Sequence, residues 1–280
     1  MKHHIGIMQG RLSPRPVGKL QAFPHNCWQR EFSLAARLGF DAIEWIFEAD
    51  RSAENPILTA SGRAEIVRAS RSSGVAVRSV CGDYFMIERL AGAGRDANLR
   101  NRSVLRELIQ QAAELGAERI LLPLLETSAL PTAELKDEIV ECLQAVAPVA
   151  EEYRVVLGLE MEIPGEEYAD LIARVGHPMV KAYYDVGNST AQGFDVATDV
   201  VPLLPKLHAV HIKDRRTHGV SVPVGRGDAN FPGFFRALKS AGFVGDLLLQ
   251  HFFDDDPEGA ARAALAYVRR ELAAAGEAAA

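Results

Sequence analysis

The chain has 280 residues, of which 48% are hydrophobic and 24% are charged, and its formal net charge is −6. This composition is typical of a globular protein, and no apolar run approaches the roughly 20 residues that cross a bilayer, so we expect neither disorder nor a membrane partner. The basic residues are spread along the chain, whereas nucleic-acid binders concentrate them against phosphates, so we expect no nucleic-acid partner either.

Short β-rich runs alternate with longer segments of helical periodicity along the whole chain. Taken in order, the β-rich runs predict strands at Ile5–Met8, Ala42–Ile46, Ala76–Val80, Arg119–Leu124, Val155–Glu160, Val180–Asp185, His208–His211 and Asp246–Gln250. The periodic segments predict helices that include Trp28–Leu38, Ala97–Leu115, Glu134–Glu152, Glu166–Val175, Val196–Leu204, Phe231–Ala241 and Pro257–Ala274.

Glycine marks several of the expected helix-to-strand joints, at Gly39, Gly74, Gly116 and Gly242. Glycine is expected there because it tolerates the left-handed conformation that ends a helix. Repeated strand–helix units predict parallel strands with right-handed crossovers, and eight such units favour a closed α/β fold, the (β/α)8 TIM barrel, over an open sheet. We predict a single domain over residues 1–280, with residues 273–280 as a frayed tail.

The cysteines, Cys27, Cys81 and Cys142, are scattered, odd in number and without a CxxC spacing. This pattern implies no disulfide framework and no zinc or redox motif. The apolar run at the N-terminus is too short and too soon interrupted for a signal peptide. We therefore expect a cytoplasmic protein.

Candidate functional residues stand at the ends of four consecutive predicted strands: Glu160, Asp185, His211 and Gln250. Functional groups of a (β/α)8 barrel come from the C-termini of its strands and the loops that follow. Two carboxylates, one neutral imidazole and one amide oxygen suit a divalent ion such as Mn²⁺, Co²⁺, Mg²⁺ or Zn²⁺. Each residue alone is readily explained as a helix cap or a rim group. Together, at equivalent positions, they indicate a metal site.

Six stretches keep, in order, the pattern of a known family. They are residues 5–13 (IGIMQGRLS), 39–45 (GFDAIEW), 157–160 (LGLE), 184–188 (YDVGN), 211–214 (HIKD) and 224–227 (VGRG). In them the chain resembles the sugar phosphate isomerase/epimerase family of xylose isomerase-like TIM barrels. The resemblance implies a metal-dependent enzyme that moves a proton next to the carbonyl of a small sugar, sugar phosphate or polyol. It also implies that Glu160, Asp185 and His211 bind the metal.

Gln250 departs from the family pattern, since related ketose epimerases carry there a glutamate that binds the metal and exchanges a proton. An amide oxygen can bind a metal, but glutamine cannot exchange a proton near neutral pH. We therefore place catalysis at Glu160 and Gln250, with Glu160 moving the proton, either alone or with a second base from elsewhere. The candidates for that second base are Glu162, Glu44, Asp214 and His251.

Further polar residues are candidates for substrate contacts: Gln9, Arg11, Glu44, Asp83, Asn188, Lys213, Asp214 and Arg226. Some have equally simple structural interpretations. Arg11 could be a surface ion-pair partner, Glu44 could belong to an internal ion pair, and Arg226 could sit in a simple turn instead of a glycine-flanked anion-binding loop. His251 has the strand parity opposite to Gln250, which favours a position away from the site.

Two other functions stay open at this point. A binding or sensing barrel without turnover would follow from the loss of the last glutamate at Gln250. Phosphodiester cleavage, as in related barrel-type DNA repair endonucleases, is disfavoured because those sites look like three-metal clusters with more strand-end histidines. The expected partner is a small sugar or sugar phosphate, and a homo-oligomer is left open.

Overall fold

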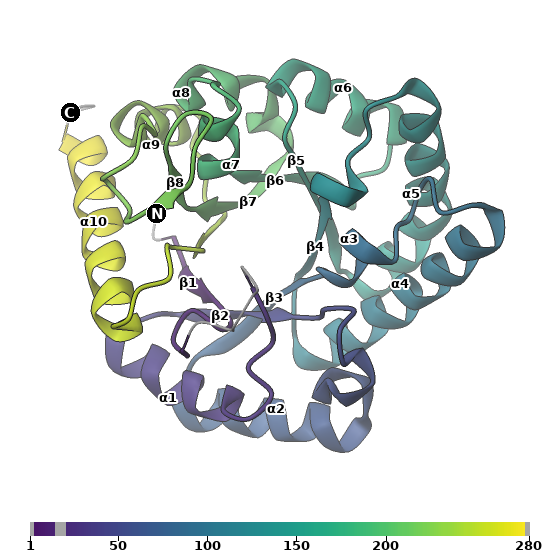
Figure 1. The fold of residues 1–280 in the computed structure, drawn as a ribbon, viewed down its shortest axis with the longest axis horizontal. Coiled ribbons are helices and arrows are strands. Elements are labelled where there is room, and N and C mark those ends of the chain that lie inside the picture. The colour runs from purple at the N-terminus through teal and green to yellow at the C-terminus, as the bar shows by residue number, and fades with distance from the viewer. Residues whose placement is uncertain (1–2, 15–20, 278–280) are drawn as a thin grey trace.

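The computed structural model describes residues 3–14 and 21–277. Its main strands are all parallel and close into a barrel in the order β1-β10-β7-β6-β5-β4-β3-β2 (Figure 1). The strands are β1 (Ile5–Met8), β2 (Ala42–Ile46), β3 (Ala76–Cys81), β4 (Arg119–Leu124), β5 (Val156–Met161), β6 (Val180–Asp185), β7 (Leu207–Ile212) and β10 (Asp246–Leu249). This arrangement confirms the predicted (β/α)8 TIM barrel.

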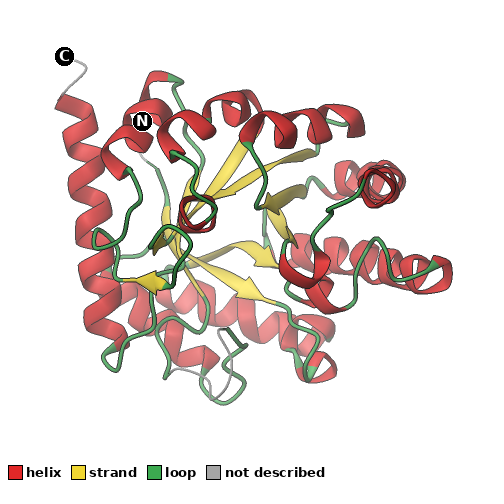
Figure 2. Cartoon of the chain, turned by 45° about the horizontal axis from the view of Figure 1, so that its top comes forward, coloured by secondary structure: helices red, strands yellow, loops and turns green. Residues whose placement is uncertain are grey.

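Helices form a ring around the barrel (Figures 1 and 2). They are α1 (Trp28–Leu38), α2 (Ala60–Ser73), α3 (Tyr84–Ile87), α4 (Arg95–Leu115), α5 (Ala133–Tyr153), α6 (Gly165–Val175), α7 (Val186–Ala191), α8 (Val196–Asp199), α9 (Phe231–Ser240) and α10 (Pro257–Glu277). Gly39 ends α1 with φ 86° and Gly74 ends α2 with φ 75°, in the left-handed conformation that we expected at these joints.

Two of the predicted helix boundaries were wrong. The segment predicted as one helix over Val196–Leu204 is instead the short α8 followed by a 3₁₀-helix, η4 (Val201–Lys206). Pro202 and Pro205 explain the break, because proline has no N–H to donate to an α-helical hydrogen bond. At the other end, α10 continues to Glu277, so residues 273–277 are helical and not a frayed tail; residues 278–280 lie outside the described part of the chain.

Three short elements that we did not predict lie beside the carboxyl ends of the barrel strands. Helix α3 follows β3 after two residues, and α7 begins directly after β6. Strands β8 (Asp214–Arg215) and β9 (Ser221–Val222) form a two-stranded antiparallel hairpin just after β7. These elements cover the end of the barrel at which (β/α)8 enzymes place their functional groups.

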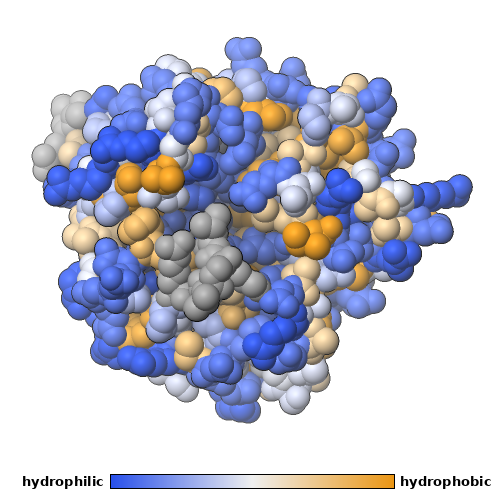
Figure 3. Space-filling view, in the orientation of Figure 1, coloured by the Kyte–Doolittle hydropathy of each residue, from blue (hydrophilic) through white to orange (hydrophobic). Residues whose placement is uncertain are grey.

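Strands β1, β2, β4 and β5 are buried along their whole length, as expected of parallel strands enclosed by helices. On the face shown in Figure 3, apolar side chains form small separate patches in a mostly hydrophilic surface. Among the described residues, no helix is both long enough and apolar enough to cross a membrane.

Candidate metal centre

Three metal-binding types of side chain converge at the carboxyl ends of β5, β6 and β7. Glu160, Asp185 and His211 each offer a ligand atom, and these atoms lie within 4.8 Å of one another. His211 Nδ1 is 3.8 Å from Asp185 Oδ2 and 3.9 Å from Glu160 Oε1. All three residues are buried. Three of the four strand-end positions named from the sequence therefore meet at one point, because adjacent parallel strands bring their ends to the same level.

Two atoms at this point, and one on Gln250, have no partner within the described protein. Asp185 Oδ2, His211 Nδ1 and Gln250 Oε1 are buried and make no hydrogen bond. A buried polar atom without a partner costs about 1–3 kcal/mol, so such atoms are rare unless a ligand satisfies them. Two carboxylates, an imidazole and an amide oxygen are a donor set that fits a divalent cation. The residues present therefore fit a metal ion.

The two carboxylate oxygens of Asp185 have different surroundings: one caps a helix, and the other makes no hydrogen bond. Oδ1 accepts a hydrogen bond of 2.7 Å from the backbone N–H of Asn188 and so caps the N-terminus of α7, a role that aspartate fills well. Oδ2 remains directed at His211 without a hydrogen bond. The cap fixes the side chain of Asp185. Helix α7 thereby holds the second carboxylate oxygen, Oδ2, in the direction of His211.

Glu44 lies on the far side of His211 and holds its imidazole. His211 Nε2 is 2.6 Å from Glu44 Oε2, while Ser79 Oγ and Tyr183 Oη each donate to Glu44 Oε1 at 2.6 Å. A carboxylate behind a metal-binding histidine fixes its tautomer and orientation. Gly158 leaves room for this arrangement, since a Cβ on it would lie 3.0 Å from the Tyr183 ring.

Both oxygens of Glu44 are therefore engaged by protein donors in a fully buried position. We listed Glu44 among the substrate contacts; the structure instead gives the internal ion pair that was its alternative. Burial alone would raise the pKa of Glu44, but the charge of His211 and its three hydrogen-bond donors lower it below its usual value.

The electrostatics of the three converging residues favour positive charge between them. Burial by itself would lower the pKa of His211, but Glu44 and Glu160 raise it to about 10. Burial raises the pKa of Glu160 to about 7, and repulsion from Asp185 adds to this effect against the opposing influence of His211. In the absence of a metal, a proton on His211 supplies the positive charge that the carboxylates attract.

Asn188 links the metal site to two cationic side chains. Its Nδ2 donates to Glu160 Oε1 at 3.1 Å, and its Oδ1 accepts from Lys213 Nζ at 3.0 Å and from Arg215 Nη1 at 3.2 Å. Lys213 Nζ is also 4.0 Å from Asp185 Oδ2. Sequence reasoning named Asn188 and Lys213 but missed Arg215, whose position depends on the unpredicted β8–β9 hairpin.

Glu162, a candidate second base, does not join the three converging residues. Strand β5 ends at Met161, and Glu162 accepts from Gln192 Nε2 at 3.2 Å and lies 4.0 Å from Arg215 Nη1. Burial raises the pKa of Glu162, and Arg215 opposes that effect. Its carboxylate therefore lies on the same side of the barrel mouth as the Lys213–Arg215 pair.

Polar residues on the opposite side of the barrel mouth surround Gln250. Gln9 Oε1 accepts from the backbone N–H of Ile46 at 3.1 Å. Gln250 Nε2 donates to Gln21 Oε1 at 3.0 Å, and Gln21 also bonds to Arg11 and Asp83. Gln21 was not among the predicted residues. Arg11 is buried and is not the surface ion-pair partner that we considered.

The loop around Arg226 does not present its glycine N–H groups to an anion. Asp214 Oδ2 accepts hydrogen bonds of 2.8 Å from the backbone N–H groups of both Gly225 and Gly227. These N–H groups are therefore satisfied within the chain and are not presented to a phosphate, and Arg226 is exposed to solvent. Asp214, predicted as a substrate contact, instead organises the loop, so the turn that was the simpler interpretation is what the structure shows.

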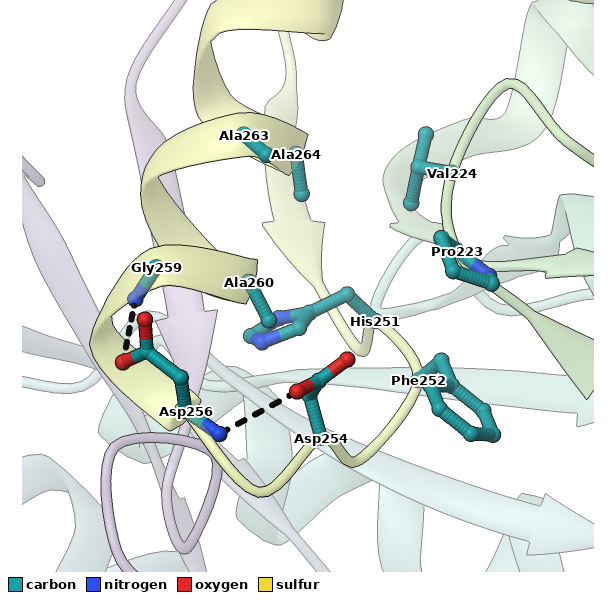
Figure 4. Close-up of a pocket in the computed structure, with 10 residues that line it drawn as sticks. All are labelled: Pro223, Val224, His251, Phe252, Asp254, Asp256, Gly259, Ala260, Ala263 and Ala264. Atoms are coloured by element: carbon teal, nitrogen blue, oxygen red, sulfur yellow. Dashed lines mark hydrogen bonds between the residues drawn. The ribbon is translucent and has the colours of Figure 1, made fainter.

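His251 faces away from the metal site, as its strand parity predicted. Its ring lines a separate cavity of about 330 Å³ between the start of α10 and the loop at Pro223 and Val224 (Figure 4). Burial, with a further contribution from Arg11, lowers the pKa of His251 to about 3. A ring with so low a pKa is a weak base, and it lines a cavity in which Glu160, Asp185 and His211 take no part.

These features agree with the comparison to known proteins. The family model described as xylose isomerase-like TIM barrel matches residues 32–271, so the chain belongs to this family. It is 26% identical over 267 residues to the L-ribulose-5-phosphate 3-epimerase UlaE of an Escherichia coli strain, and the match covers 89% of this chain and 92% of that protein.

Solved structures share the fold at lower sequence identity. An L-ribulose 3-epimerase superposes with a TM-score of 0.79 and 18% identity, covering 99% of this chain and 97% of that one. The D-psicose 3-epimerase of Clostridium cellulolyticum H10, solved with D-tagatose, superposes with a TM-score of 0.78 and 17% identity, covering 96% and 99%. The named relatives are thus sugar epimerases.

Proposed function

We propose that the chain is a metal-dependent isomerase or epimerase that moves a proton next to the carbonyl of a small sugar or sugar phosphate. The observation that carries this proposal is the convergence of Glu160, Asp185 and His211, of which Asp185 and His211 direct unpartnered buried atoms at one point. The activities named for the relatives, which are epimerisations of ketoses and a ketose phosphate, support the same reaction class.

We propose a divalent ion held by Glu160, Asp185, His211 and Gln250. Such an ion would polarise the substrate carbonyl and stabilise the negative charge that develops on its oxygen. The oxygen-rich set with one imidazole favours Mn²⁺ or Co²⁺, with Mg²⁺ and Zn²⁺ as the other candidates. The two carboxylates would together neutralise its charge. A glutamate in place of Gln250 would bind the ion more tightly but make it less electrophilic.

Glu160 is the proposed base. Its buried carboxylate lies at the point of convergence, within reach of a substrate bound to the ion, and a carboxylate can accept and return a proton. Asn188 holds Oε1 of Glu160 in place from α7. Lys213 and Arg215 converge on Asn188 Oδ1 and are proposed to bind oxygen atoms of the substrate, among them the oxyanion formed when the proton leaves.

Gln250 limits the stereochemistry that this site can perform. Because glutamine does not exchange a proton near neutral pH, the symmetrical reaction with two glutamates on opposite faces of the substrate is not available. We propose that Glu160 removes and returns the proton on one face, as in an aldose–ketose isomerisation. Epimerisation would require a second base, for which Glu162, half-buried beside Arg215, is the remaining candidate at the mouth.

The proposal is tested by incubating Mn²⁺-loaded and Co²⁺-loaded protein in deuterated water with L-ribulose, L-ribulose 5-phosphate, D-psicose and other sugars, with NMR detection of exchange. We expect exchange of the proton next to a carbonyl that stops when a chelator removes the metal. Tight binding of metal and sugar without exchange would favour a non-catalytic binding barrel. Absence of both metal binding and exchange would overturn the proposal.

We also propose a reducing, cytoplasmic environment. Cys27, Cys81 and Cys142 are free thiols in the structure, and disulfides are rare in reducing compartments. Fractionation of the source cells with an antibody against the chain would test this location.

A further inference from the structure

An amide ligand raises a problem that a carboxylate ligand does not. A glutamate presents an oxygen whichever way its carboxylate is rotated, but a glutamine presents either its oxygen or its NH₂ group. An NH₂ group directed at a cation would repel it. If Gln250 binds the metal, as the proposed function requires, something must hold its amide in the orientation that directs Oε1 at the ion.

The contacts of Gln250 match this requirement. Its Nε2 donates to Gln21 Oε1 at 3.0 Å, and its Oε1 is buried with no hydrogen-bond partner in the described chain. The orientation of Gln250 is therefore correct only if Gln21 in turn presents its oxygen, and not its nitrogen, toward Gln250.

Two charged residues fix Gln21. Arg11 Nη2 donates to Gln21 Oε1 at 3.3 Å, and Gln21 Nε2 donates to Asp83 Oδ2. A guanidinium group can only donate hydrogen bonds and cannot lose its proton, whereas a carboxylate accepts them. Rotating the Gln21 amide by half a turn would place NH₂ against the guanidinium and C=O against the carboxylate, so a single orientation is permitted.

Arg11 and Asp83 are themselves held by contacts away from Gln21. Arg11 Nη1 donates to the carbonyl oxygen of His251 at 3.1 Å, and its guanidinium lies 4.0 Å above the centre of the Phe253 ring. Asp83 Oδ1 accepts from the thiol of Cys81 at 3.1 Å. The polarity of this chain of hydrogen bonds is therefore set by the guanidinium of Arg11, which cannot accept, and by the carboxylate of Asp83, which accepts while it is ionised, although burial raises its pKa.

We infer that Gln21 is a positioning residue: Arg11 and Asp83 act through it to orient the Gln250 amide so that Oε1 faces the metal. This inference rests on the proposed function, because it assumes that Gln250 is a ligand. It assigns a joint role to Arg11 and Asp83, which we had expected to contact substrate. It also predicts that the network matters only because residue 250 is an amide.

A double-mutant cycle tests this dependence on the amide. In the wild-type background, Gln21→Met removes both polar atoms while keeping an unbranched side chain, and we expect the Mn²⁺ affinity measured by calorimetry to fall about tenfold or more, as for other supporting residues of metal sites. In the Gln250→Glu background, the carboxylate needs no orientation, so we expect Gln21→Met to leave the Mn²⁺ affinity within about twofold or to improve it.

The cycle distinguishes failure of this inference from failure of the proposed function. An equal loss of affinity in both backgrounds would show that Gln21 only supports the fold of the mouth and would overturn the inference while leaving the metal site intact. Failure of the wild-type protein to bind Mn²⁺ or Co²⁺ would overturn the proposed function itself. Gln29→Met is the matched control, because Gln29 bonds to Glu65 on the exposed surface, and it should change neither metal affinity nor melting temperature.

Discussion

Buried charged side chains are paired differently at the two ends of the barrel. At the amino end, the buried Arg119 donates to Asp246 Oδ2 at 2.6 Å, and Arg78 donates to the same oxygen at 2.8 Å. At the carboxyl end, Glu160 and Asp185 have no Lys or Arg nitrogen within hydrogen-bonding distance among the described residues; the nearest is Lys213 Nζ, 4.0 Å from Asp185. The charges at the amino end are neutralised within the chain, whereas the two carboxylates at the carboxyl end have no paired lysine or arginine in the described chain.

The difference shows how a stable barrel can carry a site that is costly in isolation. At the amino end, the charges of Arg119, Arg78 and Asp246 are paired within the chain. The carboxyl end keeps the carboxylates of Glu160 and Asp185 together, so their repulsion is offset by a bound cation or, without one, by a proton on His211. Stability and function are thus divided between the two ends, as in other (β/α)8 barrels, and substitutions at each end should affect one property without the other.

The largest effect is expected from Asp185→Asn. The asparagine can still cap α7, but it removes one of the two carboxylate charges, so we expect Mn²⁺ affinity to fall on the order of 1,000-fold, more than the loss of a supporting residue would cause. Proton exchange should be lost with it. The melting temperature of the metal-free protein should stay unchanged or rise, because repulsion with Glu160 is relieved.

A clear drop in metal-free stability would contradict this interpretation, since it would make Asp185 a structural residue. Asp137→Asn is the control: Asp137 pairs with Arg174 on the exposed surface, and the same change of charge there should leave metal affinity as it was.

Arg119→Met should show the reverse pattern at the amino end. It removes one partner of a buried ion pair, and we expect the free energy of unfolding measured in urea to fall by about 3 kcal/mol. The loss is at the lower end of the usual range because Arg78 still pairs with Asp246. Mn²⁺ affinity should not change; a large change would mean that the two ends are coupled.

The comparison for this variant is Arg37→Met. Arg37 pairs with Glu258 at 3.2 Å, but both side chains are exposed, and such pairs contribute about 0–1 kcal/mol. A similar loss of stability in both variants would show that burial is not what makes the amino-end pair important.

Glu31 provides a third kind of buried carboxylate: among the described residues it has hydrogen-bond donors but no cationic partner. It accepts from the backbone N–H groups of Gly10 and Leu12 and from Ser13 Oγ. Burial raises its pKa from 4.5 to about 7 in spite of these donors. It therefore stabilises the fold below pH 4.5, and this contribution is lost as the pH rises to 7.

Glu31→Gln cannot titrate, so its free energy of unfolding relative to wild type should rise by on the order of 2 kcal/mol between these two pH values. Urea denaturation at several pH values would measure the difference, and parallel curves for the two proteins would contradict the assignment. Glu65→Gln, at a half-buried position where the side chain bonds to Gln29, should give parallel curves.

The fold was predictable because its signal is local. Each of the eight barrel strands lies in a short run rich in apolar residues, and glycines such as Gly39 mark where helices end. The convergence of Glu160, Asp185 and His211 was predictable for a related reason, since the barrel geometry alone brings the ends of neighbouring strands together. The errors fell where local signals conflict, as at Pro202 and Pro205, where a helical pattern contains residues that cannot continue an α-helix.

The partners of the site residues were not predictable in the same way. Gln21 and Gln250 are 229 residues apart in sequence, and nothing in either segment indicates the other. Asp214 stands in the resembling stretch HIKD, yet its carboxylate binds the backbone of the following loop. Such contacts depend on side-chain directions at the barrel mouth, and a pattern of residue types does not specify them.

Glu44→Gln should have the smallest effect of the four substitutions. The glutamine still fits beneath His211, but it removes the charge that favours positive charge on the imidazole, so we expect Mn²⁺ affinity to fall roughly tenfold, at the low end for supporting residues. In the metal-free protein, NMR titration should show the His211 pKa falling from about 10, because the largest raising contribution is gone. Ser79→Ala keeps the carboxylate and should leave the pKa of His211 raised.

If the pKa of His211 stayed near 10 in Glu44→Gln, the carboxylates at the barrel mouth would be sufficient to hold the positive charge. Glu44 would then serve only to orient the ring.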